Sequence, residues 1–328
     1  MTSESKNIFG LDVGFGNFKL FGANASIILP SHVSVQTGNE YQIAGMSSGR
    51  KPLNIIKDGT SYYVGENAHQ WGTPIENVDS NRLLGSPEAS ILMHGVFTHY
   101  MKNNDLHNLD NITVAVGLPL ELSKANEARS NAAKVRSWIQ GTHQWGADGE
   151  QYQITIDTVL ITSQAAGVIQ DHALGLNGQP IGANKPAVLG EVGLISIGYR
   201  TIEIMVLNNM KMNQNLTAGT SGGVRELLEI CNGDQLYTLG ELDSQLRSGK
   251  VATPNQQKIW ERQAIGHIEK VWGKKWRRFE KVIIVGGGAE IASKTIANYF
   301  GSKLHKPDEP VLAIAKGMYK WAIAKSGG

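Results

Sequence analysis

The sequence has little of several features that would point to particular protein classes. Its single cysteine, Cys231, cannot form an internal disulfide, which excludes a disulfide-stabilised scaffold and fits a reducing compartment. No apolar run approaches the ~20 residues that a membrane helix needs. The formal net charge of +2 gives no general attraction to nucleic acid or to a membrane surface. The polar start, MTSESKN, lacks the apolar core of a signal peptide, so we expect a cytoplasmic protein without a membrane partner.

The rest of the composition is that of an ordinary globular protein, with 41% hydrophobic and 18% charged residues. A chain of 328 residues is long enough for two domains, because single hydrophobic cores stop growing near this size. We therefore expect two lobes with a cleft between them.

Hydrophobic periodicity predicts a mixed α/β chain whose two halves repeat the same order, with hairpin strands first and helices after them. Residues 7–70 are predicted to form a meander of short strands, including one at 41–45, because β-rich segments alternate with turn residues. The predicted helices are 87–103, 122–139, 163–174, 224–232, 255–276, 289–300 and 309–324, and the longer predicted strands are 112–120, 151–162, 192–198, 201–208 and 281–285.

The segment GLDVGFGNFK, residues 10–19, combines a short apolar strand, an aspartate, two glycines and a lysine. Gly14 and Gly16 allow the backbone to bend closely around an anion, and Lys19 can supply a positive charge. Asp12 would repel a phosphate unless a cation lay between them, which indicates magnesium held through water. A plain glycine hairpin between two strands explains the same residues, and this segment alone does not decide between the two interpretations.

Glycine turns recur after other predicted strands, at Gly198 and at Gly286 to Gly288. Two similar lobes that each present a phosphate-binding hairpin would hold one nucleotide between them. Gly286 to Gly288 precede a helix, so amides at the helix start can face an adenosine and its phosphates. A sharp bend is the plainer explanation of these three glycines.

The order of the segments DVGFGNFK, VGLP, TSQAAG, SIGYRTIE, VGGGAE and AIAKGMYK resembles the actin, sugar kinase and heat-shock chaperone ATPase superfamily. Within it, DVGFGNFK, ILPSHVS, YYVGENA and IGYRT are most similar to prokaryotic actin-like proteins, the ParM and archaeal-actin-like group that segregates plasmids or forms cytoplasmic filaments. The resemblance implies an α/β actin-like fold of two ribonuclease-H-like lobes with a nucleotide cleft. It places lobe I at residues 1–162, with a C-terminal helix at 310–328 packed back on it, and lobe II at 163–309.

The resemblance also assigns residues to the cleft. Asp12 faces hydrated magnesium, and Gln164 lies where actin-like proteins keep a Gln or Glu that orients the attacking water, so both are catalytic candidates. A polar helix cap at Gln164 or Ser163 is the alternative. Gly219 belongs to a predicted turn that lines the pocket or is a plain loop. The expected nucleotide contacts are Gly14, Phe15, Gly16, Asn17, Lys19, Gly198, Tyr199, Arg200, Thr201, Gly219, Gly286, Gly287 and Gly288.

Two positions depart from the family pattern, which usually has Asp where this chain has Ser196 and again where it has Glu203. The first of these aspartates normally helps to hold the water shell of the metal and the attacking water. Ser196 therefore puts fast hydrolysis in doubt while leaving phosphate binding by backbone amides intact. Glu191 is a candidate to compensate, if it reaches the cleft.

We expect a nucleotide-gated polymer, in which ATP or GTP with Mg²⁺ closes the lobes and copies of the chain assemble head to tail into filaments. Plasmid or DNA segregation or cell organisation is the implied role, and segregation would add a DNA-binding adaptor as partner. The alternatives are a non-hydrolysing nucleotide-binding scaffold and, less favoured, a small-molecule kinase, for which Asp157 and Asp171 lie off the expected position of a catalytic base. The basic and aromatic segment 269–281 fits an amphipathic helix or a filament contact better than direct DNA binding.

Overall fold

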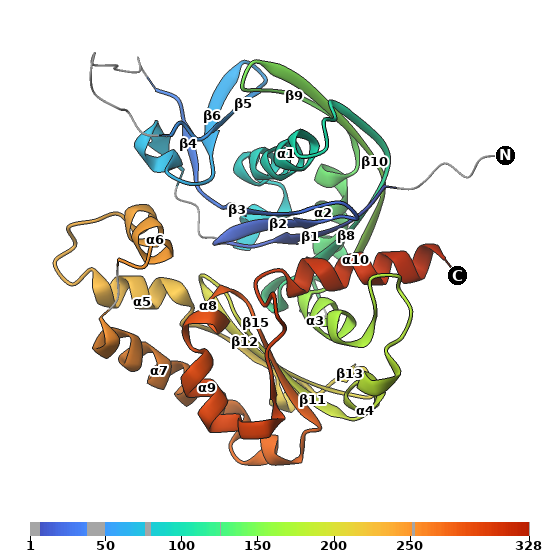
Figure 1. Cartoon of the computed structure of the whole chain (residues 1–328), viewed down its shortest axis with the longest axis vertical. Helices are drawn as coiled ribbons and strands as arrows, with labels where there is room; N and C mark the ends of the chain where they lie inside the picture. The colour runs from blue at the N-terminus through green and yellow to red at the C-terminus, as the bar shows by residue number, and fades with distance from the viewer. Residues whose placement is uncertain (1–6, 38–49, 76–79, 125, 251–252, 328) are drawn as a thin grey trace.

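The computed structural model describes residues 7–37, 50–75, 80–124, 126–250 and 253–327, which form two β-sheets with helices around them (Figure 1). The strand predicted at 41–45 lies outside the described residues. The predicted α/β class is confirmed. We call the ten-stranded sheet with the helices packed on it lobe I, and the six-stranded sheet with its helices lobe II.

The sheet of lobe I has three parallel strands at its centre and antiparallel strands on both sides. The inner parts of the first two of these strands, residues 9–13 and 112–118, are buried on both faces, which explains their mostly apolar sequence. In sheet order the strands are β3 (Ser26–Pro30), β2 (Asn17–Phe21), β1 (Asn7–Val13), β8 (Asn108–Leu118), β10 (Glu150–Ser163), β9 (Gly141–Ala147), β5 (Leu53–Lys57), β6 (Thr60–Val64), β4 (Val33–Val35) and β7 (Thr73–Pro74).

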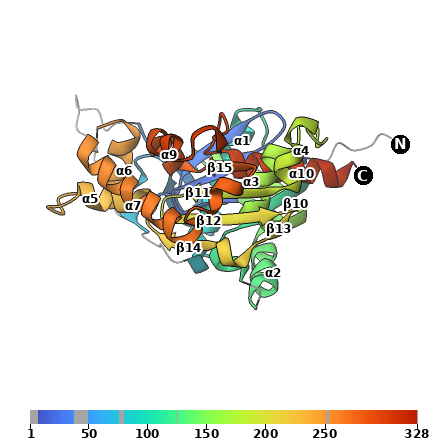
Figure 2. The same ribbon diagram turned by 90° about the horizontal axis from the view of Figure 1, so that it is seen from below.

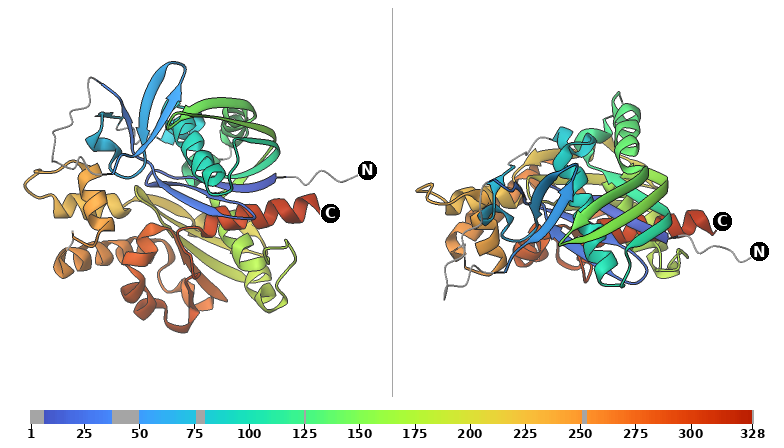
Figure 3. Two further views of the ribbon diagram at one scale, coloured as in Figure 1. Left: turned by 45° about the horizontal axis from the view of Figure 1, so that its top comes forward. Right: turned by 90° about the horizontal axis from the view of Figure 1, so that it is seen from above.

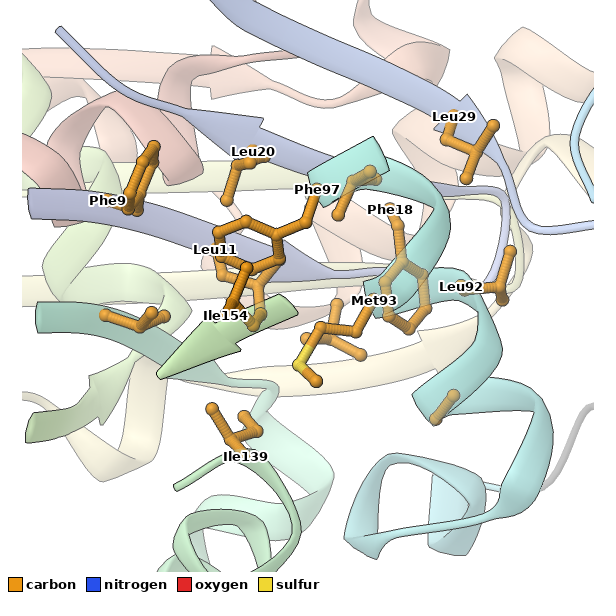
Figure 4. Close-up of a cluster of buried hydrophobic side chains, with 14 of the residues drawn as sticks. Phe9, Leu11, Phe18, Leu20, Leu29, Leu92, Met93, Phe97, Ile139 and Ile154 are labelled. Atoms are coloured by element: carbon orange, nitrogen blue, oxygen red, sulfur yellow. The ribbon is translucent and has the colours of Figure 1, made fainter. Parts of the chain in front are cut away.

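The sheet curls around α1 (Pro87–Lys102), which lies between β1 to β3 on one side and β5, β6 and β9 on the other (Figures 1 and 3). Ser86 begins this helix by accepting a hydrogen bond from the Ala89 amide, with proline in the first turn. Inside the curl, Phe97 of α1 meets Phe9 of β1 edge to face at 5.4 Å between ring centroids (Figure 4). This core holds the β1–β2 hairpin against α1.

The sheet of lobe II is smaller, and β11 is flanked by an antiparallel and a parallel neighbour. Its order is β13 (Lys211–Met212), β12 (Thr201–Asn208), β11 (Glu191–Ile197), β15 (Lys281–Val285) and β16 (Leu304–His305), and β14 (Ala218–Ser221) also pairs with β12. The helices of this lobe are α4 (Lys185–Leu189), α5 (Val224–Cys231), α6 (Leu239–Arg247), α7 (Pro254–Trp272), α8 (Gly287–Ile291) and α9 (Ser293–Phe300).

Two helices, α3 (Gln164–Ala173) and α10 (Ala313–Ser326), lie side by side between the sheets (Figure 2). They cross in backbone contact, because a Cβ atom on Gly317 would lie 1.8 Å from the Gly167 carbonyl oxygen. The ammonium of Lys320 pairs with Asp171 at 2.7 Å across the same crossing. Since α10 also contacts β1 and β8, it joins the C-terminal end of the chain to lobe I.

Several predicted boundaries are wrong by a few residues. The helix predicted at 255–276 ends at Trp272, because Gly273 takes a φ of 51°. The helix predicted at 289–300 is interrupted at Ala292, and the last helix begins at Ala313 rather than 309. The helix predicted at 122–139 is a 3₁₀ turn at Leu120–Ser123 followed by α2 (Ala128–Ile139).

Strand β9 and helix α6 were not predicted. The remaining short 3₁₀ helices are Ala68–Gln70, Ser80–Leu84, Gly182–Asn184, Gln214–Leu216, Lys275–Arg278 and Gly301–Lys303. Among the described helices, each is too short or too polar to span a membrane.

Candidate functional site

Two β-hairpins, one from each lobe, meet at the centre of the molecule. The turn between β1 and β2 is closed by a hydrogen bond from the Gly14 amide to the Asn17 carbonyl at 3.2 Å. The turn between β11 and β12 is closed in the same way, from Gly198 to Thr201 at 2.9 Å. The hairpins touch, since a Cβ atom on Gly16 would lie 2.7 Å from Cβ of Tyr199. Glycine at position 16 is what allows this approach.

A cavity of about 410 Å³ lies between the hairpins, and we call it the main cavity. Its walls come from both lobes and from the junction helices α3 and α10. The predicted site residues that line it are Asp12, Gly14, Phe15, Gly16, Asn17, Lys19, Gln164, Gly198, Tyr199, Arg200, Thr201, Gly286 and Gly287.

Gly219 and Gly288 do not line the main cavity. Gly219 lies in strand β14, opposite Glu203 of β12, so the turn predicted there is regular sheet. Gly288 packs α8 onto β11, because a Cβ atom there would lie 2.1 Å from the Ile197 side chain. Its glycine is explained by helix–strand packing rather than by the cavity.

Asp12 and Lys19 face each other across the β1–β2 ladder and form a buried ion pair of 2.7 Å. The amide of Gln164, at the start of α3, donates a hydrogen bond of 3.1 Å to the other carboxylate oxygen of Asp12. The side chain of Ser163 caps the helix, so Gln164 does not serve as that cap. The Lys19 ammonium therefore gives Asp12 a counter-charge within the chain, a contact that the sequence analysis does not include.

Ser196 and Glu203 are the corresponding cross-strand pair of the β11–β12 hairpin, and both are buried in the wall of the main cavity. One oxygen of Glu203 accepts a hydrogen bond of 2.9 Å from the Leu120 amide of lobe I. The other oxygen is buried and has no hydrogen-bond partner among the described residues. Burial raises the pKa of Glu203 to about 7, against the lowering effect of the Leu120 amide.

This donor set fits a divalent cation that is held through water. Magnesium keeps several waters and is bound by one or two carboxylates. Asp12 and Glu203 line the same cavity, and Glu203 has a carboxylate oxygen to offer. Glu203 thus supplies, from the opposite strand, a carboxylate that Ser196 cannot.

The ring of Phe15, at the tip of the lobe I hairpin, lies between two guanidinium groups. Arg82 of lobe I and Arg200 of lobe II stand 5.2 and 5.3 Å from its centroid. Arg200 also reaches Glu121 of lobe I at 3.6 Å. Phe15 and Arg200, both predicted to contact the nucleotide, therefore also contact each other across the boundary between the lobes.

The outer part of the main cavity contains residues that the sequence analysis missed. Asp243 is buried and paired with Arg247 at 2.8 Å, one turn apart on α6. The capping box of Thr238 and Glu241 could have revealed this helix, because a Ser or Thr followed three residues later by Glu marks a helix start. The other unpredicted lining residues are Val13, Ile28, Leu83, Pro119, Val224, Leu246, Glu290, Ile291, Val311 and Ile314.

The remaining candidates lie elsewhere. Glu191 forms a two-point ion pair with Arg278 at 2.6 and 2.8 Å and does not line the main cavity, so it cannot replace a carboxylate at Ser196. Asp171 pairs with Lys320, and Asp157 is exposed on lobe I. In the segment 269–281, the Trp272 and Phe279 side chains are buried in the core of lobe II, as the amphipathic interpretation expects.

Comparisons with known proteins agree with this architecture. Residues 10–167 match the family described as "Actin like proteins N terminal domain". An archaeal actin homolog from Thermoplasma acidophilum is 28% identical over 239 residues, which cover 71% of this chain and 65% of the relative, just under two thirds of its length.

Solved structures match over nearly the whole chain. A crystal structure of apo ParM has a TM-score of 0.74 at 17% identity and covers 98% of both chains. An archaeal actin homolog in complex with ADP gives 0.72 at 19% identity, over 96% of this chain and 99% of that one. A ParM from a 15-stranded filament of Clostridium botulinum gives 0.73 at 18% identity, over 98% and 99%. The predicted actin-like fold is confirmed, and the chain is similar to prokaryotic actin-like proteins, in sequence over residues 10–167 and in structure over nearly its whole length.

Proposed function

We propose that this chain binds ATP or GTP, with Mg²⁺, in the main cavity, and that triphosphate binding drives its assembly into filaments. The observation that supports this most is the pair of facing hairpins, one from each lobe, around a single cavity. A ligand that touched both hairpins would hold the lobes together. The solved relatives include an ADP complex and a filament, which supports the same two properties here.

In this proposal the turn amides of both hairpins bind phosphate oxygens, and Lys19 and Thr201 add an ammonium and a hydroxyl. A magnesium ion would supply charge neutralisation of the phosphates, held through water by Asp12 and Glu203. When triphosphate enters, Lys19 exchanges part of its contact with Asp12 for the phosphates. The glycine turn at Gly286, with a φ of 93°, and the Asp243–Arg247 pair would enclose the nucleoside.

Gln164 is the residue that we propose orients the attacking water. Its amide nitrogen is held by Asp12 at 3.1 Å, which leaves the amide oxygen to accept a hydrogen bond from water. Asp12 therefore positions Gln164, and the pair forms the catalytic part of the site.

Lobe closure would present complementary end surfaces, and head-to-tail contacts between identical chains give open filaments. We propose that such filaments serve plasmid or DNA segregation or the organisation of the cytoplasm. In segregation, a DNA-binding adaptor protein would connect filament and cargo.

A second candidate, a nucleotide-binding scaffold with little turnover, is favoured by Ser196. This residue lines the main cavity with a hydroxyl where the family usually has a carboxylate. Binding by the turn amides would persist, while the activation of water would be weakened. The kinase alternative gains no support, because neither Asp157 nor Asp171 lines the main cavity.

Sedimentation of the full chain with ATP, GTP, ADP and GDP tests the proposal. We expect pelleting with a triphosphate and Mg²⁺, and less with diphosphates. A soluble chain under every nucleotide would refute triphosphate-driven assembly. Phosphate release in the same samples separates the hydrolysing polymer from the scaffold.

Ser196→Asp tests the effect of the serine. We expect faster phosphate release in this variant, by about tenfold if the carboxylate lowers the barrier by ~1.4 kcal/mol. Ser221→Asp is the matched control, because it adds the same charge at an exposed position of β14 in the same lobe. Equal rates in all three proteins would mean that Glu203 already fills the role.

A further inference from the structure

A second, smaller cavity of about 160 Å³ lies next to the main cavity, on the other side of the lobe I hairpin. Phe15, Gly16 and Tyr199 line both cavities, so the wall between them is one turn of chain thick. Lobe I contributes residues around β4, and lobe II contributes the start of α6. Since one water occupies about 30 Å³, the space holds several waters or one small ion.

The first turn of α6 forms one wall of this cavity through Thr238, Leu239 and Gly240. The amides of Leu239 and Gly240 donate no hydrogen bond within the described part of the chain. Free amides at a helix start carry partial positive charge and bind anions. The carboxylate of Glu241 is already engaged by the Thr238 amide and hydroxyl.

The opposite wall has buried polar atoms that lack partners. The hydroxyl of Ser34 is fully buried and makes no hydrogen bond to any residue that the structure describes. The ring nitrogens of His69 and Nδ1 of His32 are buried and unpartnered as well. Buried polar groups are nearly always hydrogen-bonded, so these atoms indicate a polar occupant of the cavity.

Two guanidinium groups complete the lining, and none of its described residues carries a carboxylate. Arg82 donates to the Gly14 carbonyl at 3.4 Å and has Glu88 nearby, and burial lowers its pKa only to about 10, so it remains charged at neutral pH. Arg225 of α5 pairs with the exposed Glu229. Asp243 approaches His32 at 3.5 Å but belongs to the wall of the main cavity.

We propose that this second cavity binds a tetrahedral oxyanion of the phosphate class, with inorganic phosphate as its occupant. Helix amides, arginine side chains, imidazole N–H groups and a serine hydroxyl can all donate hydrogen bonds, which suits the charged oxygens of a phosphate ion. Binding of free phosphate requires no nucleotide. The second cavity could also retain phosphate that is released by hydrolysis in the main cavity, and only this use rests on the proposed function.

Equilibrium dialysis of radiolabelled inorganic phosphate against the full chain tests the site, with and without saturating ADP to block the main cavity. We expect one phosphate per chain, retained when ADP is present. Arg225→Met should weaken binding by about tenfold or more, the loss expected for a charge-assisted hydrogen bond. Arg262→Met, an exposed arginine on α7, is the matched control and should bind phosphate as the unaltered chain does.

Gly240→Leu keeps the helix amides but fills the space, because a Cβ atom there would point at His69 from 3.4 Å. Leucine favours a helix more than glycine, so this variant should fold and should lose phosphate binding. The proposal is overturned if no phosphate binds, if ADP displaces it fully, or if Arg225→Met and Gly240→Leu bind as tightly as the control. Calorimetry of nucleotide binding on the same proteins shows separately whether the proposed function fails.

A second experiment determines whether the bound phosphate comes from hydrolysis or from solution. The chain is loaded with γ-labelled triphosphate and then chased with unlabelled phosphate. Label that leaves only on the chase, and leaves at once from Gly240→Leu, identifies cleaved phosphate as the occupant. Label that leaves at the same rate in both proteins, while dialysis still detects binding, identifies phosphate from solution.

Discussion

The two hairpins of the main cavity share one backbone geometry but carry different side-chain pairs. In each hairpin, a glycine amide donates a hydrogen bond to the carbonyl of the residue three positions later, which closes the turn. The residue two positions before that glycine forms a cross-strand pair with a residue of the second strand. In lobe I the pair is Asp12 and Lys19, which neutralise each other at 2.7 Å. In lobe II it is Ser196 and Glu203, which leaves one carboxylate oxygen without a partner.

This difference assigns separate tasks to the hairpins. The lobe I pair is matched before any ligand arrives, so removing one partner would leave the other charge buried and uncompensated. The lobe II pair leaves a buried carboxylate that gains a counter-charge only when a cation enters the main cavity. Before a ligand binds, the charges of the lobe I pair are therefore matched, whereas the lobe II pair still lacks a counter-charge.

The largest expected effect is that of Lys19→Met, which leaves Asp12 buried without its cation. Breaking one partner of a buried ion pair costs about 3–5 kcal/mol of unfolding free energy. Lys102→Met is the control. The Lys102–Asp148 pair has a similar length, 2.8 Å, but its side chains are 34% and 42% exposed, so its loss should cost below ~1 kcal/mol. Urea unfolding measures both. Equal losses would show that Lys19→Met does not leave Asp12 buried and uncompensated.

Glu203→Gln tests the other hairpin through pH. The folded chain keeps the Glu203 proton up to a pKa of about 7, while the unfolded chain loses it near 4.5, so stability falls as pH rises through this window. Relative to Glu203→Gln, the unaltered chain should lose about 2 kcal/mol between pH 5 and pH 8. Urea unfolding of both proteins at the two pH values gives this difference without contributions from other groups. Parallel pH profiles would contradict a raised pKa at Glu203.

Gly16→Ala tests whether the hairpins touch. Its Cβ would meet that of Tyr199 at 2.7 Å, and relieving such overpacking costs about 1–2 kcal/mol. Gly182→Ala is the control, because nothing lies within 4 Å of its added Cβ. If thermal unfolding shows the same midpoint for both variants, the lobes are further apart than described.

Glu121→Gln should have the smallest effect. It removes the 3.6 Å pair with Arg200, whose side chains are 45% and 31% exposed, and such pairs contribute below ~1 kcal/mol. Chemical unfolding at low and at high salt measures it. A loss comparable to that of Lys19→Met would mean that the lobes are held at this edge rather than at the hairpins.

The sequence predicts the turns of both hairpins well, because glycine after a buried strand is a local signal. It does not predict the Lys19–Asp12 contact, which depends on strand register, nor the burial of Glu203, which depends on packing against Leu120 of the other lobe. The sequence also does not reveal that Gly288 packs against Ile197, although this glycine belongs to the same motif as two residues that line the main cavity. Side-chain direction within a turn is a tertiary property that sequence spacing does not supply.

Helix α6 escaped notice although its capping box is visible in the sequence. The helix has only nine residues, few of them apolar, so the hydrophobic periodicity of this segment does not indicate a helix. As a result Asp243 and Arg247, which bring α6 to the main cavity, were missed. The resemblance to actin-like proteins placed the phosphate turns but not this outer wall.

The central claim is that one triphosphate contacts both hairpins at once. Amide hydrogen exchange of the full chain, with and without triphosphate and Mg²⁺, tests it most directly, because the turn amides at 15–17 and 199–201 are the proposed phosphate donors. We expect slower exchange in both turns on addition of the triphosphate. Protection of one turn alone, or of neither, would contradict the account.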